Sequence, residues 1–573
     1  MMNLTCIALP SLWVAMAVAL VPATASAQRV QNMTVHVATT RVLGPLPGAF
    51  RPSVMMSWAD DEAIQTFLAL PGKLGTVRLT LEPALTDSTS LADYRERLRN
   101  ESPRLKQLAA RGATLVLTFA RMPRWLASNS SERSTGQDGF SAREASPPAD
   151  LSAFSNLAFE TVRAINVELG MDVLYEFWNE PEAKIFWGGT QQELLSAYSA
   201  FASGARRADP KARVGGLGGS WNERRAGEPD GAAPLLKTFI DFTASPTRLP
   251  LDFVSWHNFP KYPEEGWEGA GQVRAWLIAR ALPAQTPQIV TEWNQWSTFP
   301  NWFDPPRDDV NGATFMLASL HQMSMQGVSL QTMAALQDFR DASADVAFPG
   351  DFGLLTRAPV LKKASFHAMN MLAILGGQDR VVAEIPAVDA DAQGVDVLAT
   401  AGVGKTSVLL SRHAPTSVAS LGQVFARSLR RSGITLRSQI AINDDKMLAF
   451  AKRQYQLVPS DDTAAVRQSL ETARSAAEQA RSLLADEIVV TLNTDGVSPS
   501  TPYRIYRIDA THLNPGRAYR DARANRATQE SALAAARAQQ AFAPISSGFG
   551  AVPALRLPTF SALLIVFGVD TPN

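Results

Sequence analysis

Short apolar runs alternate with amphipathic segments along residues 53–375, and the alternation repeats eight times. Such runs, bounded by turn residues or charges, are typical of parallel strands that are covered on both faces. The predicted strands span residues 53–58, 76–81, 114–119, 174–178, 213–217, 251–257, 288–293 and 327–335. Between them lie segments with helical periodicity, most clearly residues 151–169. Eight such units predict an α/β fold, a (β/α)8 TIM barrel within residues 28–377.

Two carboxylates stand at predicted strand ends. Glu180 follows the fourth strand, and Glu292 lies at the end of the seventh. In a TIM barrel the chemistry sits at the C-terminal ends of the strands, so both side chains should face the same site. Cleavage of a glycosidic bond needs one acid for the leaving oxygen and one carboxylate near the anomeric carbon. Alone, the Asn-Glu-Pro run around Glu180 is more often an ordinary loop, but the two glutamates together predict a catalytic pair.

The pattern changes near residue 378 to short runs rich in β-formers, which predict an accessory antiparallel β-sandwich over residues 378–573. Residues 30–41 alternate in the same way, so the segment 28–45 is a further candidate strand of this sandwich. Helical insertions are expected near 415–486 and 515–543. We expect these helices to pack on their own domain, with a role in partner binding or at the lip of the substrate site as the alternative.

The motifs at the strand ends resemble those of glycoside hydrolase family 39, which contains retaining β-xylosidases and α-iduronidases. The resemblance rests on Phe177-Trp178-Asn179-Glu180-Pro181, Phe186-Trp187-Gly188-Gly189-Thr190, Arg213-Val214-Gly215-Gly216, Asp252-Phe253-Val254-Ser255-Trp256-His257 and Thr291-Glu292-Trp293-Asn294. It implies that Glu180 is the general acid/base, that Glu292 is the nucleophile, and that Asn179 binds the 2-hydroxyl group of the sugar.

Further substrate-binding candidates are His257 and Arg78, because strand ends line the site of a barrel. Three tryptophans are also candidates, since indole rings can stack on sugars as readily as they pack in cores; they are Trp187, Trp293 and Trp296.

Three positions depart from the family pattern. Thr80 stands where a histidine is usual, Phe259 where a tyrosine contacts the nucleophile, and Ala334 near the place of a tryptophan platform under the sugar. These departures make the substrate harder to predict than the reaction.

Composition is consistent with this reading. The 573 residues carry equal numbers of acidic and basic side chains, so no net field favours nucleic acid or anionic lipid, and a neutral oligo- or polysaccharide is the expected partner. The single cysteine, Cys6, precludes an intramolecular disulfide. The sequence has no Cys/His cluster with metal-ligand spacing, and retaining glycosidases need no metal, so no cofactor is expected.

Residues 1–27 resemble an export signal, because an apolar stretch at 11–21 precedes the small-residue pattern Ala25-Ser26-Ala27. The stretch is shorter than the roughly 20 residues that span a bilayer, so no membrane anchor is expected. The sequence therefore predicts a periplasmic or secreted protein, and it does not specify an oligomeric state.

Taken together, the patterns predict an exported retaining glycoside hydrolase that resembles β-xylosidases. An endo-acting hydrolase of a bacterial exopolysaccharide and a non-catalytic carbohydrate-binding barrel remain alternatives. Transglycosylation also stays open, because it shares the covalent intermediate with hydrolysis.

Overall fold

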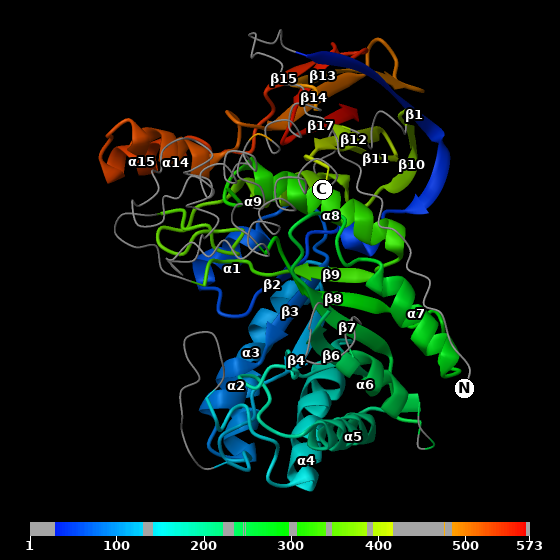
Figure 1. Cartoon of the computed structure of the whole chain (residues 1–573), viewed down its shortest axis with the longest axis vertical. Coiled ribbons are helices and arrows are strands. Elements are labelled where there is room, and N and C mark those ends of the chain that lie inside the picture. The colour runs from blue at the N-terminus through cyan, green and yellow to red at the C-terminus, as the bar shows by residue number, and fades with distance from the viewer. Residues whose placement is uncertain are drawn as a thin grey trace, which may run out of the picture.

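The computed structural model describes residues 29–129, 141–221, 234–296 except 245 and 247, 306–339, 347–386, 393–415, 475 and 484–568. A closed barrel forms one part, and a large sheet lies against one side of it (Figure 1). The predicted export signal and most of the predicted insertion at 415–486 fall outside the described residues.

Eight parallel strands close the barrel in sequence order, which confirms the predicted TIM-barrel fold. They are β2 (Val54–Met55), β3 (Thr76–Thr80), β4 (Thr114–Phe119), β5 (Leu174–Phe177), β6 (Arg213–Ser220), β7 (Phe253–Asn258), β8 (Gln288–Trp293) and β9 (Leu330–Met333). The last strand begins later than predicted, because Gly327 adopts a left-handed conformation (φ 81°) and caps the preceding helix.

Helices cover the outside of the barrel and follow the strands along the chain. They are α1 (Asp61–Leu68), α2 (Glu82–Asp87), α3 (Leu91–Ala110), α4 (Leu151–Val162), α5 (Gln191–Ala208), α6 (Pro234–Ala244), α7 (Gly269–Ala279), α8 (Val310–Gln326) and α9 (Ala364–Leu375). The stripe predicted at 151–169 is α4 continued by a π-helical segment, Arg163–Glu168. A 3-10 turn, Gly48–Phe50, precedes the first barrel strand.

The second part is one sheet of nine strands, in the order β15-β14-β17-β12-β11-β10-β1-β13-β16. Its strands are β1 (Val30–Pro45), β10 (Asp379–Glu384), β11 (Val395–Gly402), β12 (Lys405–Arg412), β13 (Glu487–Thr494), β14 (Pro502–Ile508), β15 (Ser546–Phe549), β16 (Leu555–Pro558) and β17 (Ser561–Gly568). The edge strand β16 also lies against β12 and β17, so the sheet curls over a core to which both halves contribute.

The sheet is mixed, whereas an antiparallel arrangement was predicted. The difference is a single pairing, in which β1 runs parallel to β13 with Val30 opposite Glu487. Local sequence pattern does not encode this pairing, because the two strands lie more than 400 residues apart.

Helices α8 and α9 of the barrel lie beneath the sheet and join it to the barrel (Figure 1). Two more helices, α14 (Pro515–Ala524) and α15 (Gln529–Arg537), lie within the predicted insertion at 515–543. They pack on barrel loops through a small cluster that contains Tyr519, Ala532 and Phe348, in which Tyr519 contacts Phe348. Among the described residues, no helix is both long and apolar enough to cross a membrane.

Candidate active site

The predicted site residues converge at the C-terminal end of the barrel. Arg78 lies on β3, and Asn179 and Glu180 directly follow β5. His257 lies on β7 and Glu292 on β8, where they are neighbours in the strand register. Because the strands are parallel, all five positions come to the same rim, as a TIM barrel requires.

Arg78 organises the site by binding three side chains at once. Its Nε donates to Glu176 Oε2 at 2.6 Å, one terminal nitrogen donates to Glu292 Oε1 through a short contact, and the other donates to Asn179 Oδ1 at 2.9 Å. The guanidinium is completely buried, and a buried charge of this kind is stable only when paired. The carboxylate of Glu292 and the amide of Asn179 are thereby fixed relative to each other.

His257 lies between the two predicted catalytic carboxylates. Its Nδ1 is 3.0 Å from Glu180 Oε1 and 3.9 Å from Glu292 Oε2. One side-chain atom from each of these three residues lies within 4.8 Å of the other two. A carboxylate oxygen of Glu180 and one of Glu292 therefore lie within 4.8 Å of each other.

The backbone before Glu180 adopts an uncommon conformation. Trp178 and Glu180 have φ values of 71° and 43°, in the left-handed region that residues with a Cβ seldom occupy. The amide of Glu180 donates to the carbonyl of Gly218 at 2.8 Å, which fastens the turn to the neighbouring strand. Strained positions of this kind cluster at functional sites because the surrounding fold compensates for them.

Electrostatics shift the proton affinities of the groups that surround the pair. Burial alone would lower the pKa of His257, but the charge of Glu292 and the hydrogen bond to Glu180 raise it above the ordinary value. Burial raises the pKa of Glu182 to about 7, and the charge of Glu180 acts in the same direction. For Glu176, burial acts to raise the pKa, but the positive charges of Arg78 and His257 outweigh it and lower the pKa.

Glu180, His257 and Glu292 also have the residue types and spacing of a three-ligand metal site. The positive guanidinium of Arg78 already binds Glu292, however, and would repel a cation held by the same carboxylate. The chemistry of the donor set therefore fits a proton-transferring pair better than a metal centre.

Two of the three candidate tryptophans do not contact the site surface. Trp187 is only 2% exposed, packs edge-to-face on Trp178, and donates to the carbonyl of Thr190. Trp293 is fully buried and donates to Gln331 Oε1. Packing occupies both rings in this structure, and their role in substrate binding stays a prediction. Trp296, by contrast, is 61% exposed.

Sequence reasoning missed Glu176 and Glu182. Glu176 lies inside the apolar strand β5 and accepts a hydrogen bond from Thr118 as well as from Arg78. An isolated acid in β5 and an isolated base in β3 were a usable signal, since buried charges are found in pairs. Glu182 follows Pro181 in a loop and accepts a hydrogen bond from the amide of Ser220, a contact with no sequence signal.

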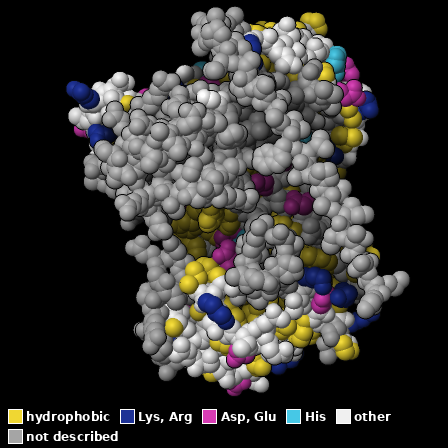
Figure 2. Space-filling view, in the orientation of Figure 1, with side chains coloured by type: hydrophobic (Ala, Val, Ile, Leu, Met, Phe, Trp, Pro, Cys, Tyr) yellow, Lys and Arg dark blue, Asp and Glu magenta, His cyan; other side chains and the backbone are white. Residues whose placement is uncertain are grey.

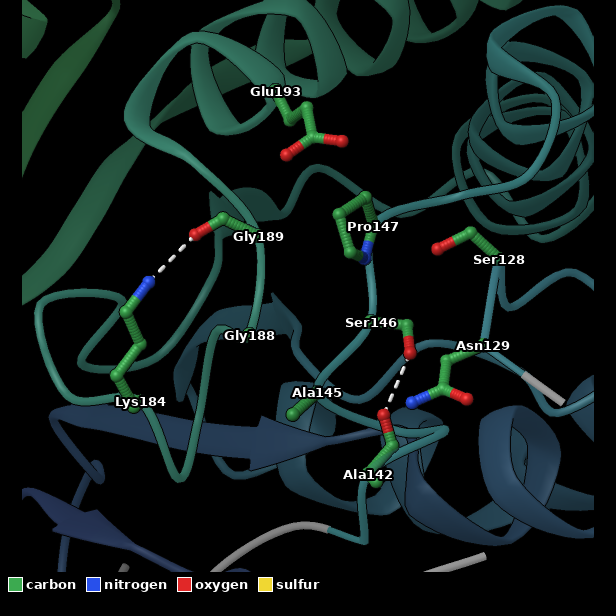
Figure 3. A pocket seen from close by; sticks show the side chains of 10 residues that line it. All are labelled: Ser128, Asn129, Ala142, Ala145, Ser146, Pro147, Lys184, Gly188, Gly189 and Glu193. Carbon is green, nitrogen blue, oxygen red and sulfur yellow. Dashed lines mark hydrogen bonds between the residues drawn. The ribbon is translucent and has the colours of Figure 1, made fainter. Parts of the chain in front are cut away.

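A separate cavity of about 350 Å³ lies beside the loop that carries Glu180 (Figure 3). Lys184 and Glu193 line it from one side, and Ser128 and Asn129 line it from the other. Lys184 donates to the carbonyl of Gly189 rather than pointing into free space. None of the residues bound to Arg78 lines this cavity, so it is distinct from the site above.

Known proteins resemble the chain in sequence and in fold. The family model described as glycosyl hydrolases family 39 matches residues 116–414, which is more than half of the chain. No curated protein sequence matches.

Solved structures cover 94% of the chain. A monomeric β-xylosidase from Caulobacter crescentus has 16% identity and a TM-score of 0.64, with 100% of its own chain covered. A family 39 enzyme from Xanthomonas axonopodis pv. citri has 17% identity and a TM-score of 0.64, with 97% covered. A glucosidase from Croceicoccus marinus has 16% identity and a TM-score of 0.56, with 100% covered. At such identities the likeness concerns the fold.

The buried pair of Arg78 and Glu176 makes a prediction about stability. We expect Glu176→Gln to lower the free energy of unfolding by about 3 kcal/mol at pH 7, because it leaves part of a buried charge without its partner. The pKa of Glu176 is lower in the folded state than in the unfolded state. The stabilisation that the Glu176 carboxylate gives to the folded state is therefore complete above the unfolded pKa of about 4.3, and it is lost as pH falls through the folded-state pKa. The difference between wild type and variant, measured by urea unfolding, should therefore narrow below about pH 4.

Asp172→Asn is the matched control, since Asp172 forms an ion pair with Arg213 but is 78% exposed. Its effect should stay within about 1 kcal/mol at every pH. Equal effects of the two substitutions would contradict the role given to the buried pair.

Proposed function

This chain belongs to family 39 of the glycosyl hydrolases, which makes it a retaining glycosidase, and we propose that it is an exported, β-xylosidase-like enzyme that acts by double displacement. The observation that carries the mechanism is the approach of Glu180 and Glu292, whose oxygens lie within 4.8 Å. Retaining enzymes separate their carboxyl groups by about 5 to 5.5 Å, whereas inverting enzymes need about 6.5 to 9.5 Å to admit a water.

In the first step a carboxylate oxygen of Glu292 forms a bond to the anomeric carbon while the bond to the leaving oxygen breaks. Glu180 gives its proton to that oxygen, so the leaving group departs as a neutral alcohol. In the second step a water attacks the anomeric carbon, Glu180 takes the water's proton, and Glu292 is released as a carboxylate. Two inversions restore the original configuration.

The neighbouring side chains support both steps. Arg78 donates to Glu292 Oε1 and so orients this carboxylate for attack. His257 contacts Glu180 through Nδ1, and a proton on that nitrogen would stabilise Glu180 once it has given up its own. Asn179 accepts from Arg78 through Oδ1, which leaves its amide nitrogen to donate to a sugar hydroxyl.

The assignment of the sugar rests on the solved structures. The Caulobacter crescentus protein is described as a β-xylosidase, and the Croceicoccus marinus protein as a glucosidase. A pentose or a hexose glycone is compatible with these two descriptions, and β-linked xylose is the first candidate.

The proposed nucleophile predicts a site-specific label. After incubation with 2-deoxy-2-fluoro glycosyl fluorides of xylose, glucose, galactose and arabinose, we expect one sugar to add to Glu292, because the fluorine slows release of the covalent intermediate. Intact mass followed by peptide mapping detects the adduct. Glu292→Ala should abolish both labelling and turnover while leaving the circular dichroism spectrum unchanged.

Glu268→Ala is the control for this experiment, since Glu268 is an exposed glutamate near the same rim. It should label and turn over like wild type. Normal activity of Glu292→Ala on a substrate that the wild type cleaves would contradict the assignment of Glu292 as the nucleophile.

The proposed acid/base predicts a dependence on the leaving group. Glu180→Ala should lower kcat/KM on unactivated glycosides by about 10²- to 10⁴-fold, the usual contribution of general acid catalysis. The loss of glycosylation rate should be far smaller on a dinitrophenyl glycoside, because that leaving group departs without a proton. The glycosylation rate is measured by pre-steady-state release of dinitrophenol for the activated substrate and by kcat/KM for the unactivated one. An equal loss on both substrates would contradict the role of Glu180 as the acid.

Export predicts a processed N-terminus. When the full chain is expressed in a bacterial host with a periplasm, the protein recovered from that compartment should begin at Gln28, as read by N-terminal sequencing. Ala27→Trp should block cleavage, because the processing site requires a small residue there. Recovery of the wild-type chain solely from the cytoplasm, with residues 1–27 attached, would refute export.

A further inference from the structure

Five aromatic side chains follow four neighbouring strands of the barrel and form what we call the aromatic arc. Trp58 follows β2, Phe259 follows β7, and Trp296 follows β8, while Phe339 and Phe352 follow β9. These strands are consecutive in the closed barrel, in the order β7, β8, β9 and β2. The arc therefore occupies one continuous half of the rim that carries the catalytic pair.

The rings touch one another in an unbroken series. Centroid distances are 6.2 Å from Trp296 to Phe259, 5.4 Å from Phe259 to Phe352, 6.4 Å from Phe352 to Phe339 and 5.8 Å from Phe339 to Trp58. Every pair packs edge-to-face, a favourable arrangement for aromatic rings. The arc is thus one surface rather than five isolated side chains.

The arc is open to solvent at several points. Trp58 is 45% exposed, Trp296 61% and Phe339 41%, and the remaining two rings are partly exposed. Figure 2 shows hydrophobic side chains beside acidic ones near the middle of the face that it draws. Contiguous exposed apolar surface on an otherwise well-packed protein marks a binding site more often than chance.

The arc is continuous with the catalytic residues. Phe259 packs on Met55, Ala334 and Ala335 at the strand ends. The sulfur of Met55 contacts Arg78, whose guanidinium binds Glu292. A ligand that occupies the catalytic gap and extends along this side of the rim meets the arc directly.

Two arginines, Arg307 and Arg121, lie against rings of the arc, and both are bound by other groups of the protein. Arg307 lies 4.1 Å from the centre of the Phe352 ring and donates to the carbonyls of Gln295 and Gly350. Arg121 lies 5.9 Å from the Trp58 ring and forms an ion pair with Glu144. Both cations are thus paired within the protein, and Arg307 covers one face of the Phe352 ring, so Trp58, Trp296 and Phe339 provide most of the exposed ring surface.

We propose that the aromatic arc binds successive sugars of a neutral glycan on the glycone side of the cleaved bond. Exposed rings fit the apolar C–H faces of sugars, and a site that is largely preformed binds at low entropic cost. The side follows from the barrel order: Glu180, which must contact the leaving group, comes from β5, opposite β9 in the ring of eight strands. The substrate is therefore an oligosaccharide or polysaccharide, and cleavage releases more than one sugar on the glycone side.

This inference rests on the proposed function, and its test compares two glycone lengths. The probes are p-nitrophenyl β-xyloside and p-nitrophenyl β-xylotrioside, which share a leaving group and differ only in the added sugars. For wild type we expect kcat/KM to be about tenfold or more higher on the trioside. Trp58→Ala and Trp296→Ala should each lower the ratio of trioside to monoside kcat/KM by about tenfold, which corresponds to the loss of one stacked ring.

Phe549→Ala is the matched control, because Phe549 is an aromatic residue that is 72% exposed on the edge strand β15, in the other part of the molecule. It should leave both kcat/KM values unchanged. If wild type and the tryptophan variants cleave both substrates with the same ratio of trioside to monoside kcat/KM, the aromatic arc does not bind the added sugars. The proposed function would still stand.

If neither xyloside is cleaved, the xylosidase-like assignment is contradicted. A second measurement then tests whether the aromatic arc binds glycan. Native electrophoresis through gels that contain xylan, β-glucan, galactan or mannan measures glycan binding without catalysis. Retardation of wild type by one polysaccharide, lost in the double variant Trp58→Ala/Trp296→Ala and kept in Phe549→Ala, supports the arc. No retardation, or equal retardation of all three proteins, overturns it.

Discussion

The site depends on one buried cation. Arg78 lies in the interior of an apolar barrel, where an unpaired guanidinium would be strongly destabilising, so its partners are obligatory. Glu176 anchors it from β5, and the remaining donors reach Glu292 on β8 and Asn179 beside the acid/base. The same requirement that neutralises the cation therefore fixes the positions of the nucleophile and of the residue that would bind the sugar. Catalytic geometry here is a consequence of charge pairing within the core.

A second buried charge cluster supports the loops that carry part of the aromatic arc. Lys363 contacts Asp308 at 2.5 Å and Asp338 at 2.7 Å, and all three side chains are buried. Burial raises the pKa of Asp338 to about 7, against the opposing charge of Lys363. Helix α14 braces the same region from outside, because Arg520 pairs with Asp309 and Tyr519 packs on Phe348. The accessory part thus contributes to the rim of the barrel as well as to its own sheet.

Sequence predicted those features that are encoded by local pattern. The eight barrel strands are short apolar runs, and Glu180 and Glu292 follow from their place at strand ends, so both the fold and the convergence of the pair were accessible. The burial of Trp187 and Trp293 could not be predicted from the sequence, because an indole ring has the same local sequence pattern whether it packs in the core or faces a ligand. Two further features were missed for another reason, namely the aromatic arc and the parallel pairing of β1 with β13. Each joins segments that are distant in the chain and come together only in the folded structure.

Two of the three departures from the family pattern, Phe259 and Ala334, are explained together by the structure. Phe259 cannot donate a hydrogen bond to the nucleophile as a tyrosine would, but Arg78 binds Glu292 Oε1 and His257 lies 3.9 Å from Oε2, so both oxygens already face polar groups. The small side chains of Ala334 and Ala335 leave room for the phenyl ring to pack on the strand ends. From there it contacts Trp296 and Phe352. Loss of a single platform under one sugar and gain of a longer aromatic surface are thus two aspects of one rearrangement, and both favour a longer glycan over a single terminal sugar.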